Sequence, residues 1–368
     1  MDQPAKRVLT VGGAMIDTIA LIESDRIERM SMNNADKAFL LLEEGRKTEA
    51  ALISTHPGGG AVNAAVAFAR LGFNVAALIK IGRDARGAAI VSALAAEAIS
   101  AECIVHTDDA ATGASVLISS HHRNAAIFTF RGANSLLVES EIAQDLYKSD
   151  VVYIASLSDG SADVFPFLVA RASEQGAFVV ANPGIRQLAA RGEAFQKALP
   201  KLDVLSMNRD EAAALVPTLS ARQRRASRRM TSPADAPDLM RRGLSASGFD
   251  MAFMQFIEVV VGLGVGTILV TDGARGAYAA NRSEIVYCPS LPVEVVGTAG
   301  AGDAFTATFC AYLAEGRTLS DALQYATVNA SSVVMFADTQ SGLLPRASVE
   351  ATKADKTPDL AVRAWPIN

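Results

Sequence analysis

Strand-like and helical runs alternate along almost the whole sequence, and this alternation restricts the fold more than any other feature. An apolar run at 7–11 precedes a small-residue helical run at 60–72, which is followed by another apolar run at 73–82. The same alternation resumes at Asp150 and includes a helical run near 187–199. A chain of this kind places helices on both faces of a mainly parallel sheet. We therefore predict an α/β fold.

A second pattern indicates a small antiparallel addition to that sheet. Two short apolar runs, ASVLISS at 114–120 and AAIFTF at 125–130, are separated by the polar residues HHRN. Two such runs joined by a short polar loop are typical of a β-hairpin. We therefore expect an antiparallel appendage in the N-terminal third of the chain.

Two polar segments interrupt the alternation. Residues 22–55 have a mixed, polar sequence, and residues 218–254 include five arginines between Arg222 and Arg229. The arginines are compatible with a patch that binds nucleic acid or phosphate. Such a cluster is more typical of a solvated insertion, which is the interpretation we favour. The sequence offers no reason for the length of the 22–55 segment.

Composition and charge argue against several classes of protein. The formal net charge of −5 is unlike that of a protein whose main partner is nucleic acid. The three cysteines are far apart in apolar sequence, which is typical of reduced thiols in a cytoplasmic protein and of neither a disulfide framework nor a zinc site. The most apolar run, at 253–270, contains Glu258 and three glycines, so we expect no membrane span.

The stretch VEVVGTAGAGDAFTATFCAYLAEG contains the most unusual local arrangement in the chain. A strand-like run at 293–296 is followed by small residues from Gly297 to Gly302, by Asp303, and by an apolar helical run that ends before Gly316. Asp303 alone could cap the helix. The glycines, however, would let backbone N–H groups converge on an anion at the helix start. An acid beside an anion site indicates chemistry.

A second glycine cluster separates this chain from two nucleotide-binding classes. Gly58 to Gly60 precede a helical run with Asn63 in its first turn, where an amide could contact a polar ligand. Asn63 takes the place of the third glycine of a G-x-G-x-x-G fingerprint, and the sequence has no G-x-x-x-x-G-K-[ST] motif. Both a Rossmann oxidoreductase and a P-loop protein are therefore disfavoured.

Two further motifs follow strand-like runs. SMNRDE places Asn208 and Glu211 at the expected start of a helix, where they would form either a capping pair or a Mg²⁺ site that acts through water. VTDGARGAY places Thr271, Gly273 and Gly276 after a strand, which by itself predicts only a turn. Neither motif is specific alone, but their order along the chain is.

Taken in order, four motifs resemble those of the ribokinase-like, PfkB-type carbohydrate kinase family. GGAVNAAVAFARLGFNVAALIKIG at 59–82 and TAGAGDAF at 298–305 are similar to the two family signatures. Between them, MNRDE and TDGARG are similar to the family's N-x-x-E and T-x-G-x-x-G motifs. The resemblance runs from Val8 to about Leu344. It implies one domain over residues 1–368, a three-layer α/β/α sandwich with a mainly parallel sheet and a small β lid.

The resemblance also implies where the lid lies. In this family strands inserted near the N-terminus cover the substrate, and the corresponding segments lie within 17–56 and 105–130, with the polar insertion at 218–254. A lid of this kind excludes water, which otherwise competes as the phosphoryl acceptor. Members often dimerise through the lid, so we expect a homodimer.

The activity that the resemblance implies is that of an ATP-dependent kinase. Asp303 corresponds to the base that takes the proton of the acceptor hydroxyl, and we expect the helix dipole to keep it ionised and therefore weakly basic. The N–H groups of Gly300, Ala301 and Gly302 correspond to the anion hole for the phosphoryl group. The positions that correspond to ATP and Mg²⁺ contacts are Asn208, Glu211 (Mg²⁺ through water), Thr271, Gly273, Gly276 and Asn329.

The acceptor that the resemblance implies is a sugar or a sugar acid. The positions that correspond to the family's substrate contacts are Asp17, Gly59, Gly60, Asn63 and, in the RGAN loop, Asn134. Ribokinase itself usually has Lys where this chain has Gly60. A nucleoside kinase is an alternative, with Phe128 and Phe130 stacking on the base. A non-catalytic ligand-binding relative is another.

One position departs from the second family signature. Members activated by K⁺ carry Asp or Asn where this chain has Gly297, and that acid helps to form their monovalent-cation site. The resemblance therefore implies ATP and Mg²⁺ as cofactors. It leaves a monovalent cation open, because the acid is missing at Gly297 but backbone carbonyls could still form the site.

Overall fold

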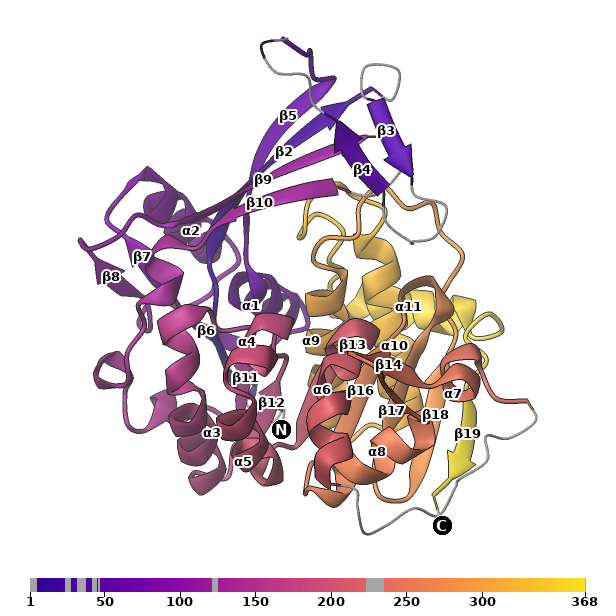
Figure 1. Cartoon of the computed structure of the whole chain (residues 1–368). Helices are drawn as coiled ribbons and strands as arrows, with labels where there is room; N and C mark the ends of the chain where they lie inside the picture. The colour runs from indigo at the N-terminus through magenta and orange to yellow at the C-terminus, as the bar shows by residue number, and fades with distance from the viewer. Residues whose placement is uncertain are drawn as a thin grey trace.

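The computed structural model describes residues 5–23, 28–31, 38–41, 45, 47–120, 125–222 and 235–367. Figure 1 shows a large body, in which a sheet lies between helices, and a smaller sheet that stands away from the body. The body carries the C-terminal ends of the strands on the side toward the small sheet, so these two parts together frame the candidate site.

The central sheet of the body has nine strands, of which six are parallel. The parallel strands, in spatial order, are β6 (Asn74–Leu78), β1 (Arg7–Val11), β11 (Val151–Ile154), β12 (Phe178–Ala181), β13 (Val204–Asn208) and β16 (Thr267–Thr271). Three antiparallel strands complete one edge: β17 (Ala277–Ala280), β18 (Glu284–Cys288) and β19 (Arg363–Pro366).

Helices cover both faces of this sheet, which confirms the predicted α/β fold. One face is covered by α1 (Gly60–Arg70), α2 (Ala85–Ala96), α9 (Ala301–Ala314), α10 (Leu319–Val333) and α11 (Arg346–Lys356). The other is covered by α3 (Phe165–Glu174), α4 (Ile185–Ala190), α5 (Gly192–Ala198), α6 (Arg209–Arg222), α7 (Asp238–Arg242) and α8 (Phe253–Gly262).

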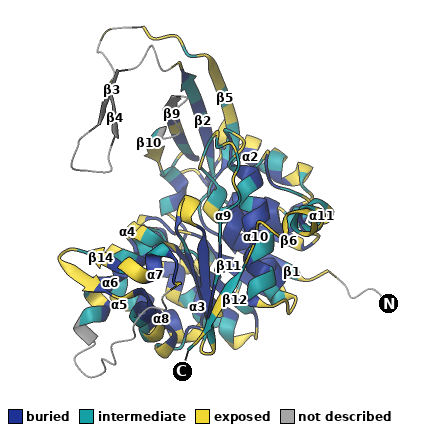
Figure 2. Ribbon diagram, turned by 90° about the vertical axis from the view of Figure 1, so that its right-hand side faces the viewer, coloured by how far each residue is buried: buried dark blue, intermediate teal, exposed yellow. Residues whose placement is uncertain are grey.

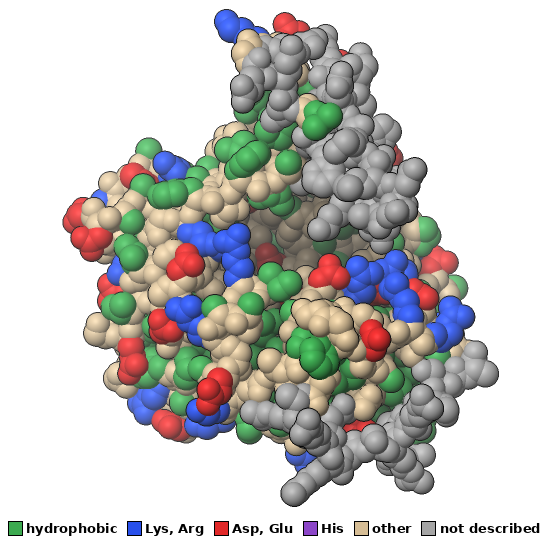
Figure 3. All heavy atoms as spheres, in the orientation of Figure 1, with side chains coloured by type: hydrophobic (Ala, Val, Ile, Leu, Met, Phe, Trp, Pro, Cys, Tyr) green, Lys and Arg blue, Asp and Glu red, His purple; other side chains and the backbone are tan. Residues whose placement is uncertain are grey.

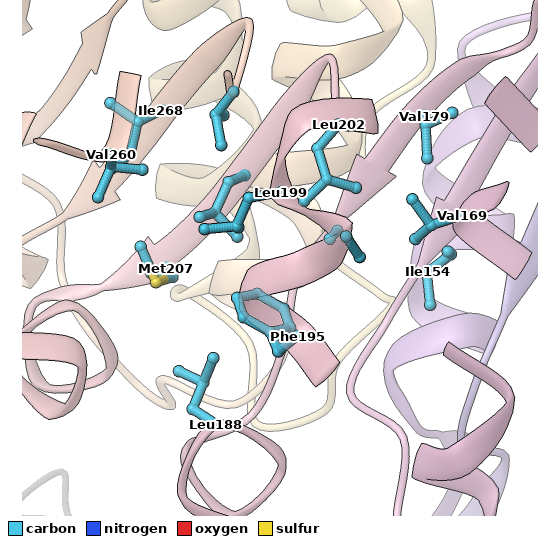
Figure 4. Close-up of a cluster of buried hydrophobic side chains, with 14 of the residues drawn as sticks. Ile154, Val169, Val179, Leu188, Phe195, Leu199, Leu202, Met207, Val260 and Ile268 are labelled. Carbon is cyan, nitrogen blue, oxygen red and sulfur yellow. The ribbon is translucent and has the colours of Figure 1, made fainter. Parts of the chain in front are cut away.

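The strands are apolar on both sides because both faces are buried. Val8 and Leu9, neighbours in β1, belong to the two different hydrophobic clusters that flank the sheet. Figure 2 shows the central strands as the most deeply buried part of the body. Figure 4 shows one of the clusters, where Met207 of the sheet lies near Phe195 of α5, and Ile154 of the sheet lies beside Val169 of α3.

The small sheet, which we call the lid, has four strands in the order β10–β9–β2–β5. Their bounds are β10 (Ala125–Phe130), β9 (Gly113–Ser120), β2 (Met15–Ile22) and β5 (Leu52–Gly58). β9 and β10 pair as the predicted hairpin. The first residues of the 105–130 segment do not belong to the lid. They form β8 (Val105–Thr107), which pairs with β7 (Lys80–Gly82). A further antiparallel pair, β3 (Glu28–Ser31) and β4 (Ala38–Leu41), belongs to the 22–55 segment.

Part of the 218–254 segment packs into the body, so the interpretation of the whole segment as a solvated insertion is wrong. α7 and the hairpin of β14 (Leu244–Ala246) and β15 (Phe249–Met251) place Leu239, Met240, Leu244 and Met251 in the core next to α6 and α8. The remaining arginine cluster, 223–229, lies outside the described residues. The apolar residues that carry this packing lie at 239–251, beyond the arginine cluster.

Two expected elements differ from the structure. The helix expected near 187–199 is divided into α4 and α5 at Arg191. The strand expected at 293–296 is an unpaired loop, in which Val296 and Gly297 donate backbone hydrogen bonds to the carbonyl of Val334 at the end of α10. These residues alternate in sequence like a strand, but among the described residues no strand pairs with them.

Candidate active site

A cavity of about 320 Å³ lies where several parallel strands end and α9 begins. Ligands of parallel α/β sheets bind at this edge. Figure 3 shows a hollow beneath the lid, with Lys and Arg side chains near it on both sides. The residues that line the cavity are Gly60, Ser156, Asn182, Pro183, Gly184, Ser206, Met207, Asn208, Glu211, Thr271, Gly300, Gly302, Asp303 and Thr306.

The start of α9 forms one wall of the cavity. Gly300 precedes the helix with φ of 76°, and a Cβ there would lie 2.6 Å from Cβ of Thr339, so only glycine fits. No atom lies within 4 Å of the position that a Cβ of Gly302 would take, which leaves open space beside the first turn. The first N–H groups of a helix have no partner inside it, so this turn offers its donors to the cavity.

Asp303, in the first turn of α9, is the acid of this wall. It accepts a hydrogen bond of 2.8 Å from Nδ2 of Asn63, which lies in the first turn of α1. Burial raises the pKa of Asp303, the hydrogen bond from Asn63 opposes that shift, and the charge of Asp17 adds to it. The net direction is opposite to the one expected from the helix dipole, because burial of the carboxylate outweighs it.

A loop that the sequence analysis did not single out fixes Asn63. Oδ1 of Asn63 accepts hydrogen bonds from Oγ1 of Thr339 at 2.8 Å and from Nε2 of Gln340 at 3.3 Å. Asp338 holds the loop in shape by accepting from the N–H groups of Gln340 and Ser341. The run DTQSG after a helix is a turn signal that could have indicated this loop, although nothing in it indicated contact with Asn63.

Asn208 and Glu211 form the reciprocal capping pair that was one of two interpretations of SMNRDE. Oδ1 of Asn208 accepts from the N–H of Glu211 at 2.9 Å, and Oε2 of Glu211 accepts from the N–H of Asn208 at 2.8 Å. Both residues also line the cavity. Burial raises the pKa of Glu211 to about 7, with a smaller contribution from Asp303 in the same direction. A nearby cation stabilises the ionised form of such a buried carboxylate.

Asp17 is the lid residue whose charge acts on Asp303. It lies in β2, is 8% exposed, and accepts a short hydrogen bond from Oγ of Ser115 in β9. A Cβ at Gly58 would lie 2.0 Å from Oδ2 of Asp17, so any side chain there would displace this carboxylate. Burial raises the pKa of Asp17, while the hydroxyl of Ser115 and the charge of His56 lower it.

Strand register extends Asp17 into a row of polar side chains. Thr129 pairs with Ser115, Ser115 with Asp17, and Asp17 with His56, so the row crosses all four strands of the lid. Directly opposed residues share one face of a sheet. We call these four residues the polar row, and they lie on the face that Asp17 presents to Asp303.

The two aromatic residues considered for base stacking lie on the opposite face of the lid. Phe128 pairs with Val116, and Phe130 pairs with Ala114, at positions that alternate with the polar row. Phe128 is 59% and Phe130 is 53% exposed. Neither ring faces the cavity side of the lid.

The glycines beside Asn63 permit close approach of the lid, α1 and α9. Gly59 has φ of 100°, and a Cβ there would lie 2.4 Å from the carbonyl oxygen of Gly13. A Cβ at Gly60 would lie 3.0 Å from Cβ of Ala155 and 3.5 Å from Oδ1 of Asp303. A long side chain at position 60 would therefore enter the space in front of Asp303.

Two residues predicted to contact ligands, Asn134 and Asn329, have side-chain amides that hydrogen-bond to protein groups in this structure. The amide of Asn134 bonds both to the N–H of Ala14, at 2.9 Å, and to its carbonyl, at 2.8 Å, and so braces the loop after β1. Asn329 is fully buried in α10, donates to Oγ1 of Thr308 and accepts from the N–H of Leu344. Neither lines the cavity.

The predicted nucleotide loop begins at the cavity wall and turns away from it. Thr271 ends β16 and lines the cavity. Gly273 and Gly276 lie in the following turn, with φ of 58° and 93°. A Cβ at Gly276 would lie 2.4 Å from the carbonyl oxygen of Cys288, so this glycine is required for packing of the turn.

Gly297 lies close to the backbone of the loop after α10. A Cβ at this position would lie 2.9 Å from the carbonyl oxygen of Phe336 and 3.2 Å from that of Ala337. An acid at this position would have to displace that backbone. The departure from the family signature is therefore matched by local packing.

Several polar residues of the cavity were not identified from the sequence. Oγ of Ser206 and Oγ1 of Thr306 lie 2.7 Å apart, and Nδ2 of Asn182 donates to the hydroxyl of Tyr153 at 3.1 Å. Ser206 lies inside an apolar strand, Asn182 follows another, and Thr306 lies inside a helix, so only the fold shows that they meet. In the described part of the chain, no cluster of three or more His, Cys, Asp or Glu side chains could hold a metal ion by itself. None of the described helices has the length and apolar character needed to cross a membrane.

Comparison with known proteins places these features in one family. The sequence profile of the pfkB family of carbohydrate kinases matches residues 7–235 and 255–346. Ribokinase of Bacillus subtilis is 27% identical over 303 residues, which cover 80% of this chain and 87% of that protein.

Solved structures show the same fold at lower identity. Ribokinase of Arabidopsis thaliana, complexed with ribose and ATP, has a TM-score of 0.70 at 20% identity and covers 95% of this chain and 99% of its own. A nucleoside kinase of Burkholderia thailandensis, in complex with inosine, has a TM-score of 0.71 at 15% identity and covers 96% of this chain and 100% of its own. The chain is therefore similar in fold to both sugar kinases and nucleoside kinases.

Proposed function

Since this chain belongs to the pfkB family of carbohydrate kinases, we propose that it transfers the γ-phosphoryl group of ATP to a hydroxyl group of a sugar or a sugar acid. The observation that carries the proposal is the hydrogen bond of 2.8 Å from Asn63 to Asp303. It holds a carboxylate with a raised pKa beside the open first turn of a helix, where an acceptor hydroxyl and a phosphoryl group can meet.

Asp303 acts as the general base in this proposal. It takes the proton of the acceptor hydroxyl as that oxygen forms a bond to the γ-phosphorus and the bond from phosphorus to the β–γ bridging oxygen breaks, which releases ADP. The transition state of phosphoryl transfer is loose, so positioning and electrostatic stabilisation contribute most of the catalysis. A pKa raised by burial makes Asp303 a stronger base than an exposed aspartate.

The first turn of α9 stabilises the charge that develops on the phosphoryl oxygens. The N–H groups of Gly300, Ala301 and Gly302 form the anion hole, and each contributes about 3 kcal/mol if it acts like an oxyanion-hole donor. Gly300 supports this role because its backbone conformation and its contact with Thr339 exclude a side chain. Open space beside Gly302 leaves room for the phosphoryl group.

The nucleotide occupies the part of the cavity lined by Asn208, Glu211 and Thr271, next to the turn that contains Gly273 and Gly276. Magnesium neutralises phosphate charge when it is bound with ATP. Glu211 fits this ion through a bridging water, because Mg²⁺ usually keeps several waters and few protein ligands. The buried carboxylate with its raised pKa supports that assignment.

The acceptor lies between Asp303 and the polar row of the lid. The row offers a carboxylate, two hydroxyl groups and an imidazole, which suit the hydroxyl groups of a sugar. A nucleoside kinase is the second candidate, since the fold accommodates both classes. It is less favoured because Phe128 and Phe130 lie on the face of the lid away from Asp303.

The proposal includes a homodimer formed through the outer face of the lid. Exposed apolar side chains gather on that face, at Ile53, Val116, Phe128 and Phe130, with exposed fractions of 67, 42, 59 and 53%. Contiguous apolar patches of this kind mark interaction sites. The proposal also places the protein in the cytoplasm, because ATP is its cosubstrate.

The proposal is tested by Mg²⁺-dependent ADP release over a panel of pentoses, hexoses, sugar acids and nucleosides, with ATP alone as the control for hydrolysis. Turnover on a sugar or sugar acid is expected. Turnover on nucleosides alone would favour the second candidate. ATP binding without turnover on any acceptor in the panel would favour a non-catalytic ligand-binding protein.

A further inference from the structure

Asp272 is a buried carboxylate beside the lining of the cavity but not part of it, and the proposed reaction does not use it. It directly follows Thr271, and its side chain is 1% exposed. Thr271 and Asn208 pair across β16 and β13 and both line the cavity. Asp272 and Arg209 are therefore the first residues beyond the cavity wall on these two neighbouring chain segments.

Three guanidinium groups from separate elements converge on Asp272. Arg275, in the same turn, donates from Nε to Oδ2 and from Nη2 to Oδ1, both at 2.8 Å. Arg242, at the end of α7, approaches Oδ2 to 3.4 Å. Arg209, the first residue of α6, approaches Oδ1 to 3.7 Å. One buried carboxylate thus gathers the nucleotide turn, the start of α6 and the 218–254 segment.

Two other acids contact these arginines from the surface. Asp210 lies 3.0 Å from Arg209 and its side chain is 73% exposed. Asp238 lies 2.9 Å from Arg242 and 3.7 Å from Arg275, and its side chain is 43% exposed. Together with Asp272 these acids equal the three arginines in number, but exposed ion pairs are weak and can give way to a phosphate group.

We propose that Asp272 positions Arg209, Arg242 and Arg275 as a cationic rim that contacts the phosphate chain of MgATP. The inference rests on the proposed function, which brings a nucleoside triphosphate into this cavity. It also assigns a role to the 218–254 segment, because Arg242 belongs to α7. The described helix α7 becomes part of the nucleotide site.

The exposure of the three arginines supports this role. Their side chains are 37, 43 and 45% exposed for Arg209, Arg242 and Arg275, although each approaches a carboxylate that is 1% exposed. One side of each guanidinium therefore faces Asp272. Asp210 also bonds to Arg209 and Asp238 to Arg242, and the N–H donors that these acids do not use are partly exposed. Arginine binds phosphate through such planar sets of donors, and a guanidinium that is already held loses less conformational entropy on binding.

Arg241 and Arg242 form a matched pair for the test. They are neighbours in α7, but Arg241 is 63% exposed and its ion pair is with Asp238, at 3.8 Å. Arg242→Gln is expected to raise the Kd of MgATP, measured by calorimetry without acceptor, roughly five- to tenfold, as the loss of one charge-assisted contact does. Arg241→Gln is expected to bind MgATP like the wild type.

Two further measurements separate binding from stability. Asp272→Asn should weaken MgATP binding more than Arg242→Gln does, because it releases all three arginines, and the Kd of the wild type should rise more steeply with salt than that of Arg242→Gln. The KM of the acceptor should stay unchanged in Arg242→Gln.

Either of two results overturns the inference. A Kd in Arg242→Gln equal to that in Arg241→Gln, while the wild type binds MgATP, would show that Arg242 does not contact the nucleotide. A lower thermal unfolding temperature in Asp272→Asn with an unchanged Kd would assign Asp272 a structural role alone. A wild type that binds no MgATP would instead contradict the proposed function itself, and the inference with it.

Discussion

Removal of the amide of Asn63 tests how the structure sets the basicity of Asp303. Asn63→Ala deletes the hydrogen bond of 2.8 Å to Oδ2 of Asp303. A hydrogen bond to a charged group contributes about 1.5–3 kcal/mol, and about 1.4 kcal/mol corresponds to one pKa unit. The pKa of Asp303, already raised by burial, should therefore rise by about one to two further units in the variant.

The direction of the effect on activity follows from the role of Asp303 as a base. The base accepts a proton only when it is ionised, so activity increases as pH rises through its pKa. In Asn63→Ala the acid limb of the profile of kcat/KM against pH should move upward by about one to two pH units, with the largest loss of rate at low pH. The measurement is ADP release across the pH range with the best acceptor.

Thr339→Val is the matched control for this prediction. It removes the hydroxyl that donates to Oδ1 of Asn63 but leaves the contact of Asn63 with Asp303 in place. Its acid limb should move much less than that of Asn63→Ala. An Asn63→Ala profile that keeps the wild-type acid limb would refute the reasoning, because the hydrogen bond would then have no effect on the pKa of Asp303.

Three other outcomes follow from the site. Glu211→Gln should raise the Mg²⁺ concentration for half-maximal activity roughly tenfold. In the wild type, Mg²⁺ activation should strengthen as pH rises through about 7, the pKa of Glu211; equal Mg²⁺ titrations for both proteins would exclude the role. Gly300→Ala, with a Cβ 2.6 Å from that of Thr339, should lower the unfolding temperature and kcat together. Because Gly297 supplies no carboxylate, the rate should be the same in potassium chloride as in choline chloride, and a large K⁺ stimulation would show that a cation site forms without the acid.

The sequence predicted the layers of the fold because the relevant signals are local. Alternation of apolar strands with helices determines where each strand is buried, and the β9–β10 hairpin follows from two runs and a short polar loop. The prediction of a strand at 293–296 was wrong because strand formation also depends on residues far away in the sequence. Its alternating side chains suit a strand, but no neighbouring strand is available, and the end of α10 binds its backbone instead.

Parts of the candidate site could be predicted where a short motif places a glycine or an amide close to an acid in the sequence. Gly300 and Asp303 are neighbours in sequence, and Asn208 and Glu211 lie one helical turn apart, so their motifs place them together at the cavity. The contact between Asn63 and Thr339 joins residues 276 positions apart and leaves no local trace in the sequence.

Two residues to which the resemblance assigned ligand contacts have side chains that bond to other parts of the protein. Asn134 braces the backbone of Ala14, and Asn329 links α9 to the segment before α11. A motif can locate a residue on a loop or a helix, but the direction of its amide depends on which donors and acceptors the fold brings within reach.

The proposed role of Asp303 is that of the base in a phosphoryl transfer to a sugar hydroxyl. It is tested most directly by transfer of the labelled γ-phosphoryl group of ATP to the best acceptor, with wild type and Asp303→Asn compared at equal MgATP occupancy, and with the exposed Asp355→Asn as a control. The account predicts that Asp303→Asn forms the same phosphorylated product at least about 10²-fold more slowly, while Asp355→Asn is unchanged. Product formation by Asp303→Asn at the wild-type rate would contradict it.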